Sequence, residues 1–202
     1  MDRRRIFLLS PANASGIRAD FLPRPEARFD LAVRLRSEGA PLGETFAFIS
    51  GLYFRGKLAY ATAFAAPPGS IPGALVIASG RGLVTPETKV TIEELRKIAS
   101  VPIDAADPRY RGPLERACRL DEAAGPDCDF VLLGSVATAK YLEPMFGIFG
   151  HRLLFPEAFV GRGDLSRGGL LLRAARSGVE LEYAPVGSLT RHGQRPPRLP
   201  KL

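Results

Sequence analysis

The side chains best suited to chemistry come just after four short apolar stretches of the chain. These stretches are 6–9, 74–78, 130–133 and 152–155, and each is followed by small, hydroxyl-bearing or basic residues. Small residues let backbone amides approach an anion, and arginines offer a two-pronged donor to phosphate. The sequence therefore predicts a binding site for a phosphate, a sugar phosphate or a nucleotide. Its candidate ligand-binding residues after these stretches are Ser10, Asn13, Arg18, Ser79, Arg81, Gly82, Ser135, Gly161, Arg162 and Arg167.

Two carboxylates after the fourth stretch, Asp164 and Glu157, are the candidate catalytic groups. The chain has only two histidines, so acidic side chains must carry proton transfer or act as the nucleophile. An anion beside an oxocarbenium-like centre suits cleavage or exchange at the N-glycosidic bond of a nucleoside or nucleotide. A structural interpretation stays open, in which 161–164 is a tight turn where Asp164 pairs with Arg162 and caps the next helix.

Several common types of site are not predicted. No Walker motif is present and no GxGxxG follows a strand, which argues against ATP and NAD sites. Cys118 and Cys128 are ten residues apart, with neither a CxxC pair nor neighbouring histidines, so we expect no zinc site. We expect no metal and no cofactor. Two reduced thiols are consistent with a cytoplasmic protein.

Positive charge is concentrated at the two ends of the chain. The formal net charge is +7, yet the segment between the ends is close to neutral. We expect one domain over 1–187 and a flexible, basic, Pro-rich tail over 188–202. These ends support a second hypothesis, a non-catalytic DNA- or RNA-binding protein that contacts the phosphate backbone. No apolar run approaches the roughly 18 residues of a membrane helix, so no membrane partner is expected.

The apolar stretches also predict the fold. They show no polar alternation, which is typical of strands buried on both faces of a parallel sheet. Segments of helical period separate them, so we predict a doubly wound α/β domain with a mostly parallel sheet of about five strands and helices on both faces. The alternating segment 179–183 predicts a half-exposed edge strand. In such a sheet ligands bind beyond the carboxyl ends of the strands, where the four turns should meet.

The helices have recognisable signals at several of their ends. Thr91 and Glu94 form a capping-box pattern that starts one helix. Ser50-Gly51 interrupts the helical period of 46–63, which predicts a loop around 52–57 before the helix resumes. Asp164 is expected to cap a further helix that ends at Gly178, with Leu165 facing inward.

Three segments together resemble the YaaA-like group of small α/β proteins and its relatives. The first is 51–61, with sequence GLYFRGKLAYA, in which a Leu-Tyr loop leads into a basic helix. The second is 76–86, VIASGRGLVTP, and the third joins 131–135, 142–144 and 159–163. The likeness covers roughly residues 46–175 and depends on order and spacing more than on identity.

The resemblance implies an α/β protein associated with nucleotides or nucleic acids, and some members are linked to DNA protection under oxidative stress. It supplies no agreed reaction, so it does not decide whether the chain is an enzyme. It adds Tyr53, Arg55 and Lys57 to the candidate ligand-binding residues, and Tyr53 would stack on a base. The near-neutral body of the chain weakens the expectation of direct DNA binding, and no clear helix-hairpin-helix signature is present.

Overall fold

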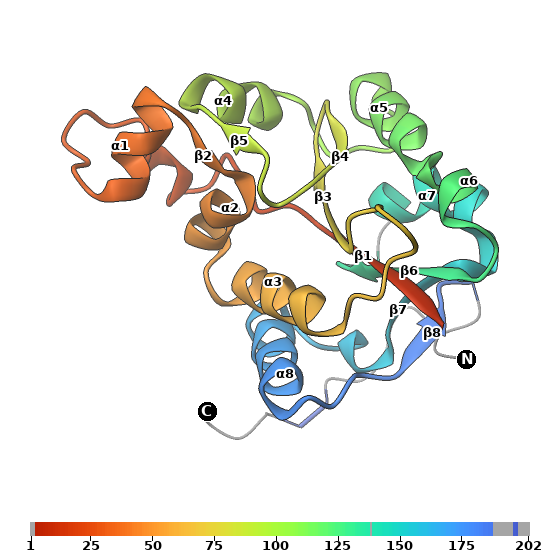
Figure 1. Cartoon of the computed structure of the whole chain (residues 1–202). Helices are drawn as coiled ribbons and strands as arrows, with labels where there is room; N and C mark the ends of the chain where they lie inside the picture. Colours follow the sequence, from red (N-terminus) through yellow and green to blue (C-terminus); the bar gives the residue numbers. More distant parts are fainter. Residues whose placement is uncertain (1–2, 138, 188–195, 198–202) are drawn as a thin grey trace.

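The computed structural model describes residues 3–137, 139–187 and 196–197 of the 202-residue chain. Most of the predicted basic tail, 188–195 and 198–202, therefore lies outside the described residues. The described chain folds around one six-stranded sheet flanked by helices, with a small second sheet to one side (Figure 1).

The main sheet has the strand order β4-β3-β1-β6-β7-β8. Strand β1 lies between β3 and β6 and pairs with both in parallel, and β6 pairs in parallel with β7. The outer strands β4 and β8 are antiparallel to their neighbours. The predicted α/β fold with a mostly parallel sheet is thus confirmed. The strands are β1 Arg4–Leu9, β3 Ala74–Ala78, β4 Gly82–Val84, β6 Cys128–Leu133, β7 Leu153–Pro156 and β8 Tyr183–Pro185, and the small sheet pairs β2 Ala40–Pro41 with β5 Lys89–Val90.

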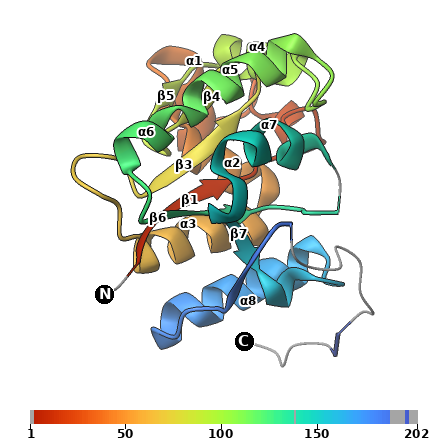
Figure 2. The ribbon, with the colours of Figure 1, turned by 90° about the vertical axis from the view of Figure 1, so that its right-hand side faces the viewer.

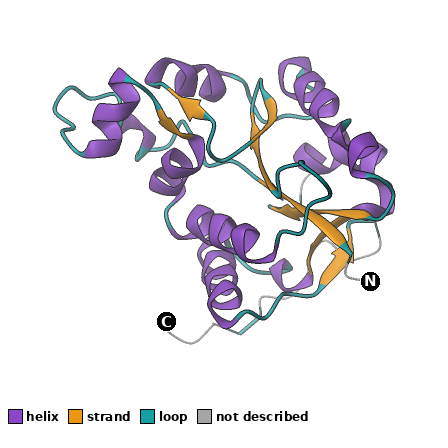
Figure 3. Ribbon diagram, in the orientation of Figure 1, coloured by secondary structure: helices purple, strands orange, loops and turns teal. Residues whose placement is uncertain are grey.

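Helices occupy the connections between the strands of the main sheet, except for the short turn from β3 to β4, as Figure 3 shows in purple around the orange strands. The α-helices are α1 Asp30–Ser37, α2 Leu42–Ser50, α3 Leu52–Phe64, α4 Ile92–Ser100, α5 Pro108–Cys118, α6 Leu120–Ala124, α7 Ala139–Phe149 and α8 Asp164–Ser177. Short 3-10 turns cover η1 Ala19–Phe21, η2 Gly150–Arg152 and η3 Glu157–Phe159. The predicted capping box at Thr91 is present, and Gly178 ends α8 in the left-handed conformation, as expected.

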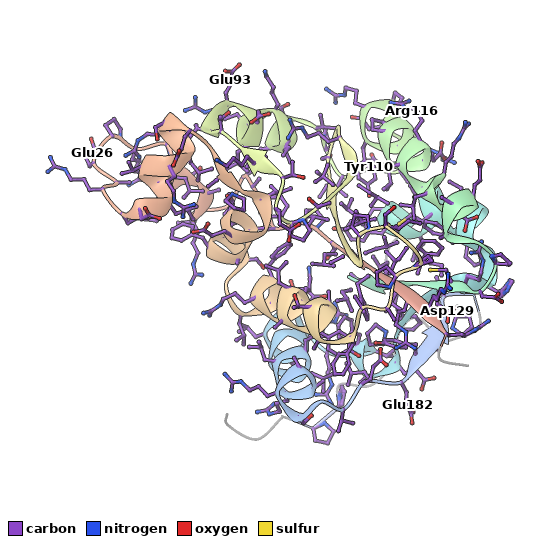
Figure 4. The ribbon with its side chains drawn as sticks, viewed as in Figure 1. Glu26, Glu93, Tyr110, Arg116, Asp129 and Glu182 are labelled. Carbon is purple, nitrogen blue, oxygen red and sulfur yellow. The ribbon has the colours of Figure 1, made fainter. Side chains whose placement is uncertain are left out.

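Alternate residues of β1 belong to two different apolar clusters. Phe7 and Leu9 pack in a cluster with residues of α2, α3 and α8, whereas Ile6 and Leu8 pack with residues of α5 and α7. Successive side chains of a strand point to opposite faces of the sheet, so helices lie against both faces. Figure 2 shows α5 and α7 above β1 and β6, with α3 and α8 below. Tyr110 of α5, labelled in Figure 4, is buried in the second cluster.

Three local expectations are wrong. Residues 52–57 form the first turns of α3 and not a loop, because Gly51, at φ 61°, changes the chain direction within one residue. The predicted strand over 179–182 is irregular, and only Tyr183–Pro185 joins the sheet. Side chains hold this segment instead: the Leu181 N–H donates to the Tyr60 hydroxyl, and Glu180 pairs with Arg5. Leu165 is 75% exposed, so it does not face the core.

Candidate functional site

A cavity of about 910 Å³ lies at the carboxyl ends of the central strands. Ser10 follows β1, Ser79 follows β3 and Ser135 comes two residues after β6, and all three line this cavity. Strand β1 has β3 on one side and β6 on the other, so it marks the point where the winding of the sheet reverses. Ligands of open α/β sheets bind at such a point.

About half of the predicted site residues meet around this cavity, together with Lys140 from the first turn of α7. The turns after β1, β3 and β6 and the start of α8 all contribute to the lining. The predicted residues that line the cavity are Ser10, Asn13, Arg18, Tyr53, Ser79, Ser135 and Asp164.

The other predicted residues lie outside the lining, and several have partners elsewhere. Arg81 turns away to pair with Glu94, at 2.6 Å. Arg162 donates to the Ala158 carbonyl at 3.0 Å and to the Ser166 hydroxyl at 3.2 Å. These two arginines therefore hold turns in place and do not form the predicted anion-binding rim. The predicted residues outside the lining are Arg55, Lys57, Arg81, Gly82, Glu157, Gly161, Arg162 and Arg167.

Gly82 is needed for the shape of its turn. Its φ of +81° lies in the region that favours glycine, and a Cβ there would stand 2.4 Å from the carbonyl oxygen of Pro113. The observed environment of Gly82 is the α5 backbone, which accounts for a glycine at this position without a ligand.

Asp164 is the first residue of α8, and its carboxylate is 72% exposed while it lines the cavity. Gly163 occupies the N-cap position, so the expected capping role of Asp164 is wrong. The ion partner of Asp164 is Arg167, at 3.6 Å, and not Arg162. Arg167 itself is largely buried and donates to the Phe159 carbonyl. Asp164 therefore presents a carboxylate to the cavity at the start of a helix.

Lys57 lies behind the cavity wall and is fully buried, with 1% of its surface exposed. Its Nζ donates to the Ser10 carbonyl at 2.8 Å and to the Ser10 hydroxyl at 2.7 Å. The same Nζ lies 3.9 Å from the centre of the Tyr53 ring. Burial lowers the pKa of Lys57 to about 7, which the Asp164 carboxylate opposes and the Arg167 guanidinium reinforces. Near neutral pH the Lys57 side chain is therefore present in both its protonated and its neutral form.

This lowered pKa predicts a pH dependence of stability. Between the folded value near 7 and the unfolded value near 10.5, the unfolded chain binds more protons, so the Lys57 contribution to stability rises with pH. From pH 6 to pH 8.5 the gain should be about 2 kcal/mol. Urea unfolding of the wild type and of Lys57→Met at both pH values measures it. An equal pH response of the two proteins would contradict this prediction.

Two tyrosines complete the wall near Asp164. Tyr53 and Tyr141 both line the cavity and are about 5% exposed. Burial raises the pKa of both hydroxyls. At Tyr53 the Arg167 guanidinium opposes this rise and the Asp164 carboxylate adds to it, and at Tyr141 the Asp164 carboxylate adds to it. The Tyr53 hydroxyl is buried without a hydrogen-bond partner among the described residues. Tyr141 was not predicted from the sequence, although its place in the first turn of the helix after the third apolar stretch was a usable signal.

A contact between two glycines brings these groups together. Gly56 of α3 and Gly168 of α8 face each other so closely that a Cβ on Gly56 would stand 2.7 Å from the Gly168 carbonyl oxygen. A Cβ on Gly168 would stand 2.7 Å from the Tyr53 Cα. The close crossing of α3 and α8 places Tyr53 and Lys57 of one helix beside Asp164 and Arg167 of the other.

No family model, no curated protein and no solved structure matches this chain. The resemblance to the YaaA-like group therefore stays a prediction, and the residues of the site are the basis for the function proposed below.

Two further observations concern the described part of the chain. Within it, no group of three or more histidine, cysteine, aspartate or glutamate side chains is placed to hold a metal ion. None of its helices is both long enough and apolar enough to cross a membrane.

Proposed function

We propose that this chain binds a nucleotide or a related phosphorylated small molecule in the strand-end cavity and acts at its N-glycosidic bond. The observation that supports this proposal most is the meeting of turns after β1, β3 and β6 with the start of α8 around one cavity. Its volume, about 910 Å³, is within the range of small-molecule sites. The resemblance to the YaaA-like group favours the same class of ligand.

The charges on the lining suit a ligand with one anionic end. Arg18 and Lys140 contribute cations. The lining also holds five serines. The Ser10 and Ser79 hydroxyls donate to backbone carbonyls, and the other three, Ser15, Ser50 and Ser135, make no such donation among the described residues and suit phosphate oxygens. Arg18 is anchored by a hydrogen bond from its guanidinium to the Phe48 carbonyl, at 3.4 Å. The lining also includes Ile49, Ile98 and Ile103, which offer apolar contact to a base or a sugar.

Asp164 is the group proposed to act in the reaction. An exposed carboxylate at the cavity wall can protonate a leaving base or stabilise positive charge on the sugar. Glu157 lies on η3 outside the lining, so Asp164 is the stronger of the two predicted catalytic carboxylates.

Calorimetric titration with AMP and with adenosine tests the phosphate site. We expect Arg18→Ala and Lys140→Met each to weaken AMP binding about tenfold, because each removes one charge-assisted contact to phosphate. Adenosine affinity should change little. Lys97→Met, which removes an exposed lysine of α4 paired with Glu93, serves as the matched control.

Equal losses for AMP and adenosine would place the phosphate elsewhere. A failure of AMP, GMP, CMP, UMP and ribose 5-phosphate to bind would overturn the proposed ligand class.

A further inference from the structure

We propose that Ser10 and Lys57 form a nucleophile–base pair that hydrolyses carboxylic esters small enough to enter the cavity. This activity goes beyond the proposed function, since it needs no nucleotide and does not use Asp164. Ser10 follows β1 directly and lines the cavity at the point where the sheet reverses its winding.

The geometry of the pair is that of an activated serine. The Lys57 Nζ donates to the Ser10 hydroxyl oxygen at 2.7 Å, within direct proton-transfer distance, while the Ser10 hydroxyl donates to the Leu133 carbonyl at 3.2 Å. When Lys57 is neutral, the Ser10 hydroxyl can turn to donate to it. A second N–H donates to the Ser10 carbonyl at 2.8 Å, which fixes the direction of the amine. A nucleophile in contact with a base that a further group orients is the general arrangement of covalent hydrolases. Gly134 keeps the space beside Ser10 open, since a Cβ on Gly134 would stand 2.9 Å from the Ser10 Cβ.

The surroundings of Lys57 favour its neutral form, which a base requires. Its contacts are the Ser10 oxygens and the faces of Tyr53 and Phe54, all uncharged. Among more distant charges, the exposed Asp164 carboxylate favours the ammonium form and Arg167 opposes it. With burial as the largest cause, the pKa of about 7 leaves a large neutral fraction at physiological pH.

Tyr53 supplies a donor for the charge that develops in the reaction. Its buried hydroxyl makes no hydrogen bond of normal geometry among the described residues, although the Arg167 guanidinium lies near it, and the residue lines the cavity next to Lys57. A preorganised donor of this kind stabilises an oxyanion because it needs no rearrangement when the charge appears. We assign it to the carbonyl oxygen of the bound ester.

The chemical step is balanced without any cofactor. The Ser10 Oγ forms a bond to the carbonyl carbon as its proton passes to Lys57, and the carbonyl oxygen becomes an oxyanion near Tyr53. The intermediate collapses with cleavage of the ester C–O bond, and the departing alcohol takes the proton from Lys57. Water then attacks the acyl group on Ser10 and gives its proton to Lys57, which returns it to the Ser10 oxygen. The net change is ester and water to carboxylic acid and alcohol.

Labelling of the full chain with an alkyl fluorophosphonate tests the pair directly. The serine oxygen displaces fluoride from phosphorus, and the adduct is counted by intact-protein mass spectrometry and located by peptide mapping. We expect one adduct, on Ser10, and none on Ser10→Ala. The labelling rate of the wild type should rise with pH to a plateau, with an inflection near 7. An unassisted serine would instead show a rate that climbs about tenfold per pH unit without a plateau.

Lys57→Arg separates catalysis from support of the fold. Arginine keeps a positive donor toward Ser10 but stays protonated, so it cannot act as the base. We expect labelling at least about 100-fold slower in this variant, with Lys97→Arg unchanged as the control. Circular dichroism shows whether Lys57→Arg folds, and the wild-type pH profile decides the question if it does not.

No adduct on Ser10, an adduct on another serine, or a pH profile without an inflection would overturn the assignment. So would equal labelling of a folded Lys57→Arg. None of these results depends on AMP binding, so failure of this inference and failure of the proposed function are distinguishable.

Discussion

Asp164→Asn should lower the rate of base release from the proposed nucleotide substrate at least about 100-fold, because general acid–base groups contribute two to four orders of magnitude. The asparagine retains the shape of the side chain at the cavity wall, and its partner Arg167 remains held by the Phe159 carbonyl. Ligand affinity should therefore stay within a few-fold of the wild type. Chromatographic detection of free base, combined with calorimetry of the same variant, measures both quantities.

Asp127→Asn is a matched control for this substitution, since Asp127 is exposed in the turn before β6. Equal losses of affinity and rate in Asp164→Asn would mean that Asp164 only shapes the start of α8. An unchanged rate would remove Asp164 from the reaction altogether.

Gly168→Ala should destabilise the fold by about 1–3 kcal/mol, the usual effect of forcing extra atoms into a closely packed contact. Its new methyl group would meet backbone atoms of Leu52 and Tyr53 at 2.7–2.9 Å, and backbone cannot swing away as a flexible side chain can. Helices α3 and α8 must then move apart, which displaces Lys57 from the charges of α8. We expect both a lower free energy of unfolding in urea and a changed pH response of stability.

Gly147→Ala provides the opposite result in another helix. Gly147 lies within α7, and a Cβ there would meet nothing within 4 Å. Replacement by alanine should stabilise the protein by about 0.5–1 kcal/mol, because glycine is the poorer helix former. A similar loss of stability in both variants would show that the close contact between α3 and α8 has no special cost.

The central strands could be predicted from the sequence because strands that are buried on both faces consist of apolar residues throughout. Uninterrupted runs such as Ala74–Ala78 have no polar face, and the strand found there has the predicted limits. The antiparallel edge β4 Gly82–Val84 was missed because three residues carry too little periodicity to be recognised. The irregular path of 179–182 was missed because it depends on distant partners such as the Tyr60 hydroxyl.

The candidate site was predictable in position but not in detail. Turn residues after parallel strands must gather at one edge of the sheet, so Ser10, Ser79 and Ser135 could be placed together. The direction of each arginine could not be predicted, because it depends on which carboxylate or carbonyl lies within reach. Arg81, for example, turns to Glu94, a partner thirteen residues away. The burial of Lys57 follows from the packing of α8 on α3, which no local pattern reveals.

The two antiparallel strands at the margins of the main sheet affect how copies of this chain can associate. Both β4 and β8 are three residues long, and β8 ends in Pro185, which has no amide hydrogen to offer. Each described margin thus offers few backbone groups to which a strand from another molecule could hydrogen-bond. Growth of the sheet from one molecule into the next is disfavoured at these margins, which protects the parallel interior strands from fibre-like stacking.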